Sequence, residues 1–295
     1  MLDAWGDHSA VAQTLAEASD ALDTDIARLI REGPKDQLDL TTNTQPVMLT
    51  AGIACYRAWM AETGMAPAVV AGHSLGEYSA LVAAGSLSLA DALPLVRFRA
   101  QAMQEAVPIG VGAMAAILGL DAEAVRAGCA EAAAATGETV EAANFNDPKQ
   151  TVISGSQAGV AKACELLKAA GAKRTLPLPV SAPFHCSLMR PAAQRLKERL
   201  ASVSFQAPRL PVLNNIDVIA ESEPARIRDA LYRQAFGPVR WFETVQAIRT
   251  MGVSHLIECG PGRVLAGMVK RIDAEAISAA LFDPASLADV RGVLA

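Results

Sequence analysis

A serine between two glycines is the residue of this chain best suited to nucleophilic chemistry. Ser74 lies in the pattern Gly72-x-Ser74-x-Gly76. The apolar run 69–71 before it predicts a buried strand, and apolar residues at helical spacing follow it. A serine at such a corner exposes its hydroxyl, and the N–H of Leu75 at the helix start is aimed at an oxyanion forming on the attacked carbonyl. We expect the corner to need both glycines, because side chains there would block the helix from approaching the strand.

A bare G-x-S-x-G pattern also fits a serine that only caps a helix, but the flanking strand and helix favour a nucleophile. His185 is the candidate general base, because it lies on a loop that leads into a predicted helix over 191–200. The other interpretation is a surface or capped histidine. Cys186 could suggest a Cys/His pair, but neighbouring side chains diverge and Ser74 already supplies a nucleophile.

Two arginines follow on a helix that begins with the capping box at 88–91. Arg97 and Arg99 point about 200° apart on a helix, so at most one of them can face Ser74. A salt bridge is the alternative for either. Gln45 precedes a predicted helix at 47–60 and either caps that helix or lines the site.

Several classes of function are disfavoured by composition and motifs. The G-x-G-x-x-A pattern at 110–115 lacks the preceding strand and following helix of a dinucleotide site. The four histidines are far apart and none lies in H-E-x-x-H spacing, so we expect no metal site. A net charge of −5 argues against nucleic-acid and anionic-membrane partners.

The compartment follows from cysteine usage and from the lack of targeting signals. Five cysteines, an odd number without a C-x-x-C motif, indicate free thiols in a reducing environment. The acidic start shows no export signal, and no apolar run has the length of a membrane span. We therefore expect a cytoplasmic protein.

The predicted elements describe an α/β protein with an insertion. Helices are expected at 11–30 and 47–60, and later elements are a strand at 210–213, helices at 226–236 and 239–251, a strand at 255–259 and a helix at 264–271. Between them lie strand 113–120, helix 122–135, strands 140–144 and 151–154, helix 158–170 and strand 173–178. That βαββαβ order is ferredoxin-like. The sequence thus predicts a large α/β domain with a mostly parallel sheet, residues 1–111 and 181–295, and a small domain at 112–180.

The motifs together resemble one family. They are Gly-His-Ser-Leu-Gly-Glu at 72–77, the stretch 103–108, Asn144-Phe-Asn146, Phe184-His185, Asn214-Asn215 and Gly260-Pro-Gly262. In this order, over nearly the whole chain, they resemble the malonyl-CoA:acyl carrier protein transacylases of bacterial fatty acid synthesis. The resemblance implies an α/β-hydrolase-like large domain with a ferredoxin-like insertion.

The resemblance also implies roles for residues. Ser74 takes the malonyl group as an ester, His185 activates it, and the backbone carbonyl of Gln234 orients His185. Arg99 pairs with the free malonyl carboxylate and so excludes acetyl and long acyl groups. Phe184 disfavours methylmalonyl.

The remaining implications concern substrate and partners. The resemblance adds His73, Asn144 and Asn146 to the substrate-binding residues. It implies ping-pong transfer from malonyl-CoA to the phosphopantetheine thiol of acyl carrier protein. We expect the protein to need no cofactor and to be a monomer. Carrier proteins are acidic, so we expect a basic patch on the helix after His185, and its candidate residues are Arg190, Arg195 and Lys197.

One departure and three alternatives stay open. The family's first strand and its Phe-Pro-Gly-Gln-Gly-Ser-Gln loop, which supplies a second oxyanion N–H, have no counterpart in this sequence. Loss of one such donor costs about a hundred- to a thousandfold in turnover, so we expect reduced activity from the chain as given, and a shortened start is the interpretation we favour. The alternatives are a serine hydrolase or thioesterase, a trans-acting polyketide acyltransferase, and an impaired fragment that only binds carrier protein.

Overall fold

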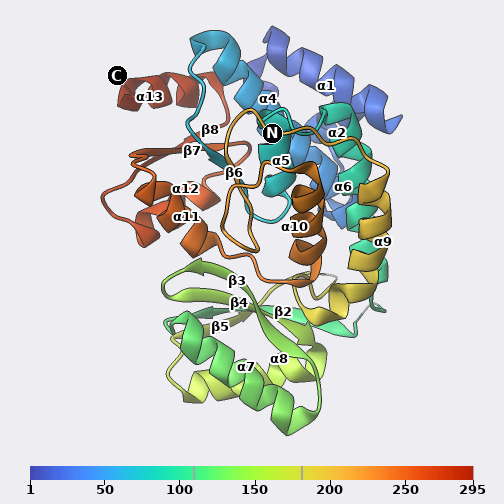
Figure 1. Ribbon diagram of the computed structural model, residues 1–295, viewed down its shortest axis with the longest axis vertical. Coiled ribbons are helices and arrows are strands. Elements are labelled where there is room, and N and C mark those ends of the chain that lie inside the picture. The colour runs from blue at the N-terminus through green and yellow to red at the C-terminus, as the bar shows by residue number, and fades with distance from the viewer. Residues whose placement is uncertain (109, 181, 295) are drawn as a thin grey trace.

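The computed structural model describes residues 1–108, 110–180 and 182–294. The N-terminal part is mostly helical (Figure 1). Its elements are η1 (Asp3–Trp5), α1 (Ser9–Leu22), α2 (Ile26–Glu32), α3 (Lys35–Asp39), α4 (Thr41–Thr63), β1 (Val70–Ala71), α5 (Gly76–Ala83) and α6 (Leu89–Glu105). Buried side chains of α1, α4, α5 and α6 form most of the largest hydrophobic core.

The prediction of one helix over 11–30 is wrong. The chain leaves the helix at Asp23, which adopts a left-handed φ of 46°. The side chain of Asp25 then accepts a hydrogen bond from the Arg28 N–H at 2.8 Å and caps a second helix. Aspartate tolerates the left-handed region and is a strong N-cap, so these two residues divide an otherwise continuous apolar pattern.

The middle of the chain forms a four-stranded antiparallel sheet covered by two helices at the bottom of Figure 1. Its elements are β2 (Gly112–Leu118), α7 (Ala122–Thr136), β3 (Val140–Asp147), β4 (Gln150–Ser156), α8 (Gln157–Ala169) and β5 (Arg174–Pro177). The strand order β3-β4-β2-β5 and a separate hydrophobic core fit the ferredoxin-like arrangement that the sequence predicts. The domain boundaries stay a prediction, and residue 181 at one of them lies outside the described residues.

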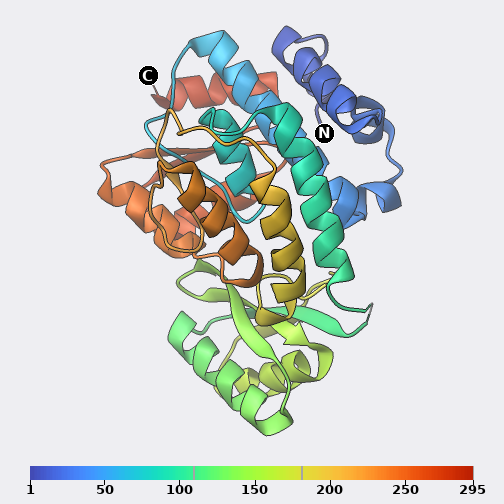
Figure 2. The same cartoon turned by 45° about the vertical axis from the view of Figure 1, so that its right-hand side comes forward.

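The rest of the chain alternates helices with short parallel strands. Its elements are η2 (Ser187–Met189), α9 (Arg190–Ala201), β6 (Val212–Leu213), α10 (Pro224–Phe236), α11 (Trp241–Thr250), β7 (His255–Cys259), α12 (Val264–Ile272), β8 (Ile277–Leu281) and α13 (Pro284–Leu294). The expected parallel pairing occurs in two separate pairs, β1 with β6 and β7 with β8. Strand β8 and helix α13 were not predicted. Helix α9 packs along α6, side by side in Figure 2.

Two backbone hydrogen bonds join the antiparallel sheet to the rest of the molecule. The Phe145 N–H of β3 donates to the Val239 carbonyl, and the Val239 N–H donates to the Ala143 carbonyl, both at 2.9 Å. An ion pair of 2.7 Å between Arg271 and the buried Asp147 lies nearby. These contacts hold the end of β3 against the part of the chain around Val239 and Arg271.

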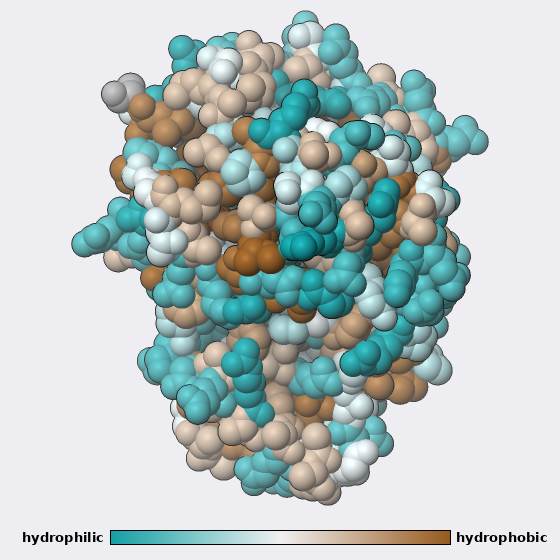
Figure 3. Space-filling model, in the orientation of Figure 1, coloured by the Kyte–Doolittle hydropathy of each residue, from teal (hydrophilic) through white to brown (hydrophobic). Residues whose placement is uncertain are grey.

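The surface in Figure 3 mixes polar and apolar residues over the face shown. Among the described residues, no helix combines the length and apolar character needed to cross a membrane.

Candidate active site

The corner between β1 and α5 holds Ser74 in a strained backbone. Its φ is 51°, in the left-handed region that residues other than glycine rarely adopt. The Ser74 N–H donates to Oδ1 of Asn215 at 2.6 Å, and Nδ2 of the same asparagine donates to the Gly72 carbonyl at 2.8 Å. One side chain therefore fastens both sides of the corner, which lets the strained conformation persist.

Ser74 and His185 meet although 111 residues separate them in sequence. Ser74 Oγ lies 2.7 Å from His185 Nε2, and His185 Nδ1 lies 2.9 Å from the backbone carbonyl of Gln234. A carbonyl only accepts, so Nδ1 must carry the proton, which leaves Nε2 free to accept the Ser74 hydroxyl hydrogen. This is the arrangement of a serine nucleophile with an oriented general base.

The Arg99 guanidinium lies against the same hydroxyl. Its Nη2 is 3.0 Å from Ser74 Oγ, and the side chain is only 2 % exposed. The side-chain oxygens of Gln45 and Gln234 accept its other hydrogen bonds at 2.8 and 3.0 Å. As expected, only one arginine faces the serine, because Arg97 instead donates to the Leu22 carbonyl.

Gln45 lies inside α4 and does not cap it, so the capping alternative is wrong and the site-lining one is correct. The helix begins six residues earlier than the prediction, at Thr41. The residues 41–46 lack an apolar pattern, which hid this first part of the helix.

A second layer of polar contacts supports the serine and was not predicted. Gln234 Nε2 donates both to the Ser74 carbonyl and to Glu77 Oε2, each at 2.9 Å. Glu77 Oε2 also accepts from the Asn215 N–H at 2.9 Å. The sequence offers only weak indications of these contacts, namely an acidic residue in the first turn of α5 and an Asn-Asn pair after a strand.

Burial shifts two pKa values at the site in opposite directions. The pKa of His185 is lowered to about 3, first by burial and then by the positive charge of Arg99. Burial raises the pKa of Glu77 to about 7, although the hydrogen bonds that its carboxylate accepts act to lower it. At neutral pH the imidazole is therefore uncharged and ready to accept a proton.

The other predicted site residues lie around this centre. His73 Nε2 is 2.9 Å from Asn146 Oδ1, and its ring packs 5.8 Å from that of Trp241. Asn144 is buried on β3 beside Val239. Among the described residues, none of these three polar side chains bonds directly to Ser74, His185 or Arg99.

Phe184 is half-buried and packs between two small hydrophobic clusters beside His185. The Leu75 N–H follows Ser74 at the start of α5 and has no hydrogen-bond partner among the described residues. An unpartnered N–H at a helix start can stabilise an oxyanion.

The described residues contain no group of three or more His, Cys, Asp or Glu side chains placed to hold a metal ion.

The sequence is similar to known proteins over nearly its whole length. Residues 6–282 match the acyl transferase domain family. The chain belongs to this family. It is 51 % identical to the malonyl CoA-acyl carrier protein transacylase of Escherichia coli (strain K12) over 278 residues, 94 % of this chain and 89 % of that protein.

Solved structures give the same result for this acyl transferase. An acyl-carrier-protein S-malonyltransferase from Burkholderia pseudomallei 1710b has a TM-score of 0.96 and 63 % identity, over 98 % of this chain and 94 % of that one. A malonyl-transacylase in complex with its type II PKS acyl-carrier protein has a TM-score of 0.92 and 50 % identity, over 95 % and 90 %.

The three basic residues proposed for carrier binding lie on α9 of the acyl transferase, beside aromatic rings. Arg190 lies over Phe236 and Lys197 over Tyr232. Arg195 forms an ion pair of 2.7 Å with Glu105. Part of the positive charge on this helix is therefore already neutralised.

Only one of the two glycines at the corner lies where a side chain has no room. The expectation that both positions must be glycine for this reason is therefore wrong for Gly76. A Cβ at position 72 would lie 2.0 Å from the backbone of Gly76, whereas a Cβ at position 76 would meet nothing within 4 Å. We expect Gly72→Ala to lower the free energy of unfolding by about 1–3 kcal/mol or more through backbone overlap. The matched Gly76→Ala should change it by less than about 1 kcal/mol. Urea unfolding of both variants tests this, and equal losses would contradict it.

The low pKa of His185 predicts an unusual pH profile. An uncharged phosphonate that labels Ser74 covalently reports on this nucleophile, and its reaction needs neutral His185. As the pH is lowered, the labelling rate should therefore not fall with a midpoint near the ordinary histidine pKa of about 6.5. An inflection near pH 7 that disappears in Glu77→Gln belongs to Glu77, whose pKa is raised to about 7. Labelling rates over about pH 5–8 measure both effects. A midpoint near 6.5 in both proteins would show that His185 titrates normally.

Proposed function

We propose that this acyl transferase moves the malonyl group of malonyl-CoA to the phosphopantetheine thiol of an acyl carrier protein through a malonyl ester on Ser74. The observation that carries the proposal is the buried Arg99 guanidinium, 3.0 Å from the Ser74 hydroxyl. The names of the relatives agree with it, since they are malonyl transacylases.

The chemistry follows as two matched half-reactions. His185 Nε2 takes the Ser74 proton as Oγ attacks the thioester carbonyl, and the Leu75 N–H stabilises the oxyanion. Collapse breaks the carbon–sulfur bond, and the imidazolium returns the proton to the departing CoA thiolate. The carrier thiol then gives its proton to His185 and attacks the ester. His185 returns this proton to Ser74 Oγ as the carbon–oxygen bond of the ester breaks, and the malonyl thioester of the carrier protein leaves.

Selectivity comes from Arg99 in this proposal. A guanidinium can hold a carboxylate with two parallel hydrogen bonds, and a malonyl group carries a free carboxylate at its far end. Acetyl and long fatty acyl groups would leave the buried charge unpaired, which is costly. Phe184 beside His185 narrows the site against methylmalonyl, and His73, Asn144 and Asn146 complete the walls.

The wider setting is part of the proposal. The transfer needs no cofactor, because both half-reactions use only serine, histidine and backbone groups. The relatives' names support malonyl transfer to an acyl carrier protein. We place this transfer in bacterial fatty acid synthesis in the cytoplasm, with the protein acting as a monomer of two domains, 1–111 with 181–295 and 112–180. A polyketide carrier is the second candidate, since one close structure holds a type II PKS acyl-carrier protein.

Mass spectrometry after incubation with malonyl-CoA tests the covalent step. We expect one malonyl group on a peptide that contains Ser74, and none on a Ser74→Ala variant. Adding holo acyl carrier protein should remove the group from the enzyme and place it on the carrier. A chain that releases only malonate, with no transfer to the carrier, would instead be a hydrolase.

Arg99 and Arg97 offer a matched pair for the selectivity step. Losing one partner of a buried charge pair costs about 2–5 kcal/mol, so Arg99→Ala should reduce malonyl loading by about thirtyfold or more. Acetyl loading should rise in the same variant. Arg97→Ala removes an equal charge from the opposite face of the same helix and should leave both rates within about twofold. Melting temperatures verify folding, and unchanged malonyl loading in Arg99→Ala would contradict the assignment.

A further inference from the structure

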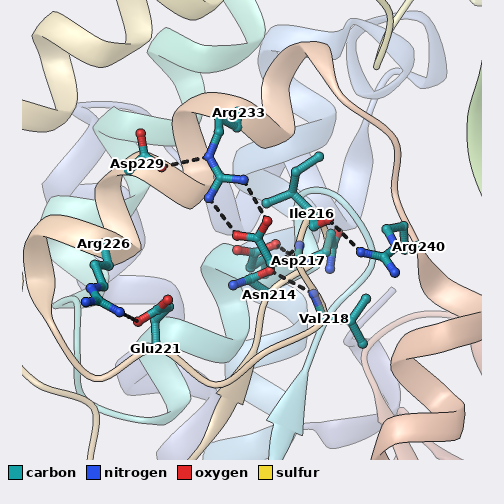
Figure 4. Close-up of polar contacts among 11 residues, drawn as sticks. Asn214, Ile216, Asp217, Val218, Glu221, Arg226, Asp229, Arg233 and Arg240 are labelled. Atoms are coloured by element: carbon teal, nitrogen blue, oxygen red, sulfur yellow. Dashed lines mark hydrogen bonds and ion pairs between the residues drawn. The ribbon is translucent and has the colours of Figure 1, made fainter.

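A turn after β6 and the last turn of α10 are joined by an ion pair (Figure 4). Arg233 on α10 donates from Nη1 and Nη2 to the two carboxylate oxygens of Asp217, at 2.7 and 2.6 Å. Its Nε donates to Asp229, one helical turn earlier, at 2.7 Å. All three donor nitrogens of the Arg233 side chain are thus used, and the guanidinium plane is fixed in orientation.

The turn itself is held in one shape. Asn214 Oδ1 accepts from the N–H groups of Asp217 and Val218, at 2.7 and 3.1 Å. Val218 has a φ of 61°, a rare conformation for a β-branched residue that surrounding contacts must maintain. Figure 4 shows Asn214, Asp217 and Val218 gathered under Arg233.

The turn also packs tightly on the end of the helix. A Cβ at Gly237 would lie 2.5 Å from the Ile216 side chain and 2.9 Å from the Arg233 carbonyl. Arg240 holds the same turn from its other side by donating to the Ile216 carbonyl at 3.2 Å. The turn and the end of the helix are therefore packed against each other and joined by hydrogen bonds.

Each partner of the ion pair lies next to a residue that contacts the reacting groups. Asp217 is two residues after Asn215, whose Oδ1 accepts a hydrogen bond from the Ser74 N–H. Arg233 directly precedes Gln234, whose backbone carbonyl accepts a hydrogen bond from His185 Nδ1. The ion pair thus connects the support of the nucleophile to the support of the base. The pKa of Asp217 is lowered, mainly by its hydrogen bond to Arg233, so the pair stays charged at neutral pH.

We propose that Asp217 and Arg233 are positioning residues that set the distance between Ser74 and His185 by clamping Asn215 and Gln234 into one unit. The inference rests on the proposed transfer mechanism, since it concerns the same serine and histidine. Neither side chain touches Ser74, His185 or Arg99 among the described residues. Their effect is therefore on the rate of Ser74 acylation and not on the affinity for the substrate.

Helix α10 supplies a control in Arg226, which forms looser ion pairs with Glu223 and Glu221 at 3.4 and 4.0 Å. Arg226 lies near the start of the helix, away from Gln234. The two test variants are Arg233→Lys, which keeps the charge but loses the two parallel hydrogen bonds, and Asp217→Asn. The control variant is Arg226→Lys. Asp217→Glu, which keeps the carboxylate, is the conservative variant.

Two rates are measured in each variant: malonyl loading from malonyl-CoA, and labelling of Ser74 by an uncharged phosphonate. We expect Arg233→Lys and Asp217→Asn to lose about ten- to a hundredfold in both rates, because a displacement of about 1 Å can cost that much. The KM for malonyl-CoA should stay within about twofold, as should both rates in Arg226→Lys. Asp217→Glu should recover part of the loss.

Unchanged rates in Arg233→Lys and Asp217→Asn would overturn the inference, as would a higher KM with an unchanged kcat. Rate losses that simply follow melting temperature across all four variants, Arg226→Lys included, would also overturn it. Phosphonate labelling separates the two proposals. If the unsubstituted chain takes no malonyl group but the two variants still label slowly, the proposed function fails and the positioning role holds.

Discussion

A buried positive charge without an ion-pair partner is the constraint on which the site depends. The Arg99 guanidinium is only 2 % exposed, and among the described residues its nitrogens meet uncharged oxygens and no carboxylate within ion-pair distance. Its Nε has no hydrogen-bond partner in the described part of the chain. Burying a charge in this way is expensive, so the surrounding dipoles must be arranged in advance. A site built like this can recover that cost when an anionic acyl group arrives.

The same charge governs the protonation of its neighbours. It acts with burial to lower the pKa of His185, so the base is neutral where the reaction needs it. It also opposes the rise in the pKa of Glu77, which burial alone would push higher. Glu77 in turn binds Gln234 and Asn215, the residues that hold the histidine and the serine backbone. The proposed recognition of the acyl carboxylate by Arg99 and the protonation of His185 thus depend on one small group of side chains.

The elements around the site are arranged to hold these groups in place. The guanidinium, on α6, is contacted from α4, from α10 and from the corner before α5, and each contact comes from a helix or a strained turn. The parallel strands are short, only two residues in β1 and β6. Side-chain hydrogen bonds therefore supply much of the precision that a longer sheet would otherwise give. That explains why the ends of α10 and β6 carry so many polar contacts.

Sequence patterns predicted the local parts of this arrangement well. The strand and helix around Ser74, and the βαββαβ order of the middle segment, follow from apolar periodicity and turn residues, which act over a few positions. The proximity of Ser74, His185 and Arg99 was expected from motifs and resemblance, and the contacts in the structure agree.

The sequence could not reveal contacts between distant residues. The Gln234 side chain donates to Glu77 across 157 residues of sequence, and the backbone N–H of Asn215 donates to it across 138. Neither amide lies in a local pattern that indicates its partner. The space at Gly76 also depends on neighbours brought in by the fold. The helical position of Gln45 was missed for a local reason, because residues 41–46 lack an apolar pattern.

A crystal structure of the chain after loading with malonyl-CoA tests the central claim most directly. The account predicts an ester on Ser74 whose free carboxylate accepts two hydrogen bonds from the Arg99 Nη atoms, at about 2.7–2.9 Å. The bond from Arg99 to Ser74 Oγ should be lost in that structure. A malonyl carboxylate that points into solvent, while Arg99 keeps its contacts with Gln45 and Ser74, would contradict it.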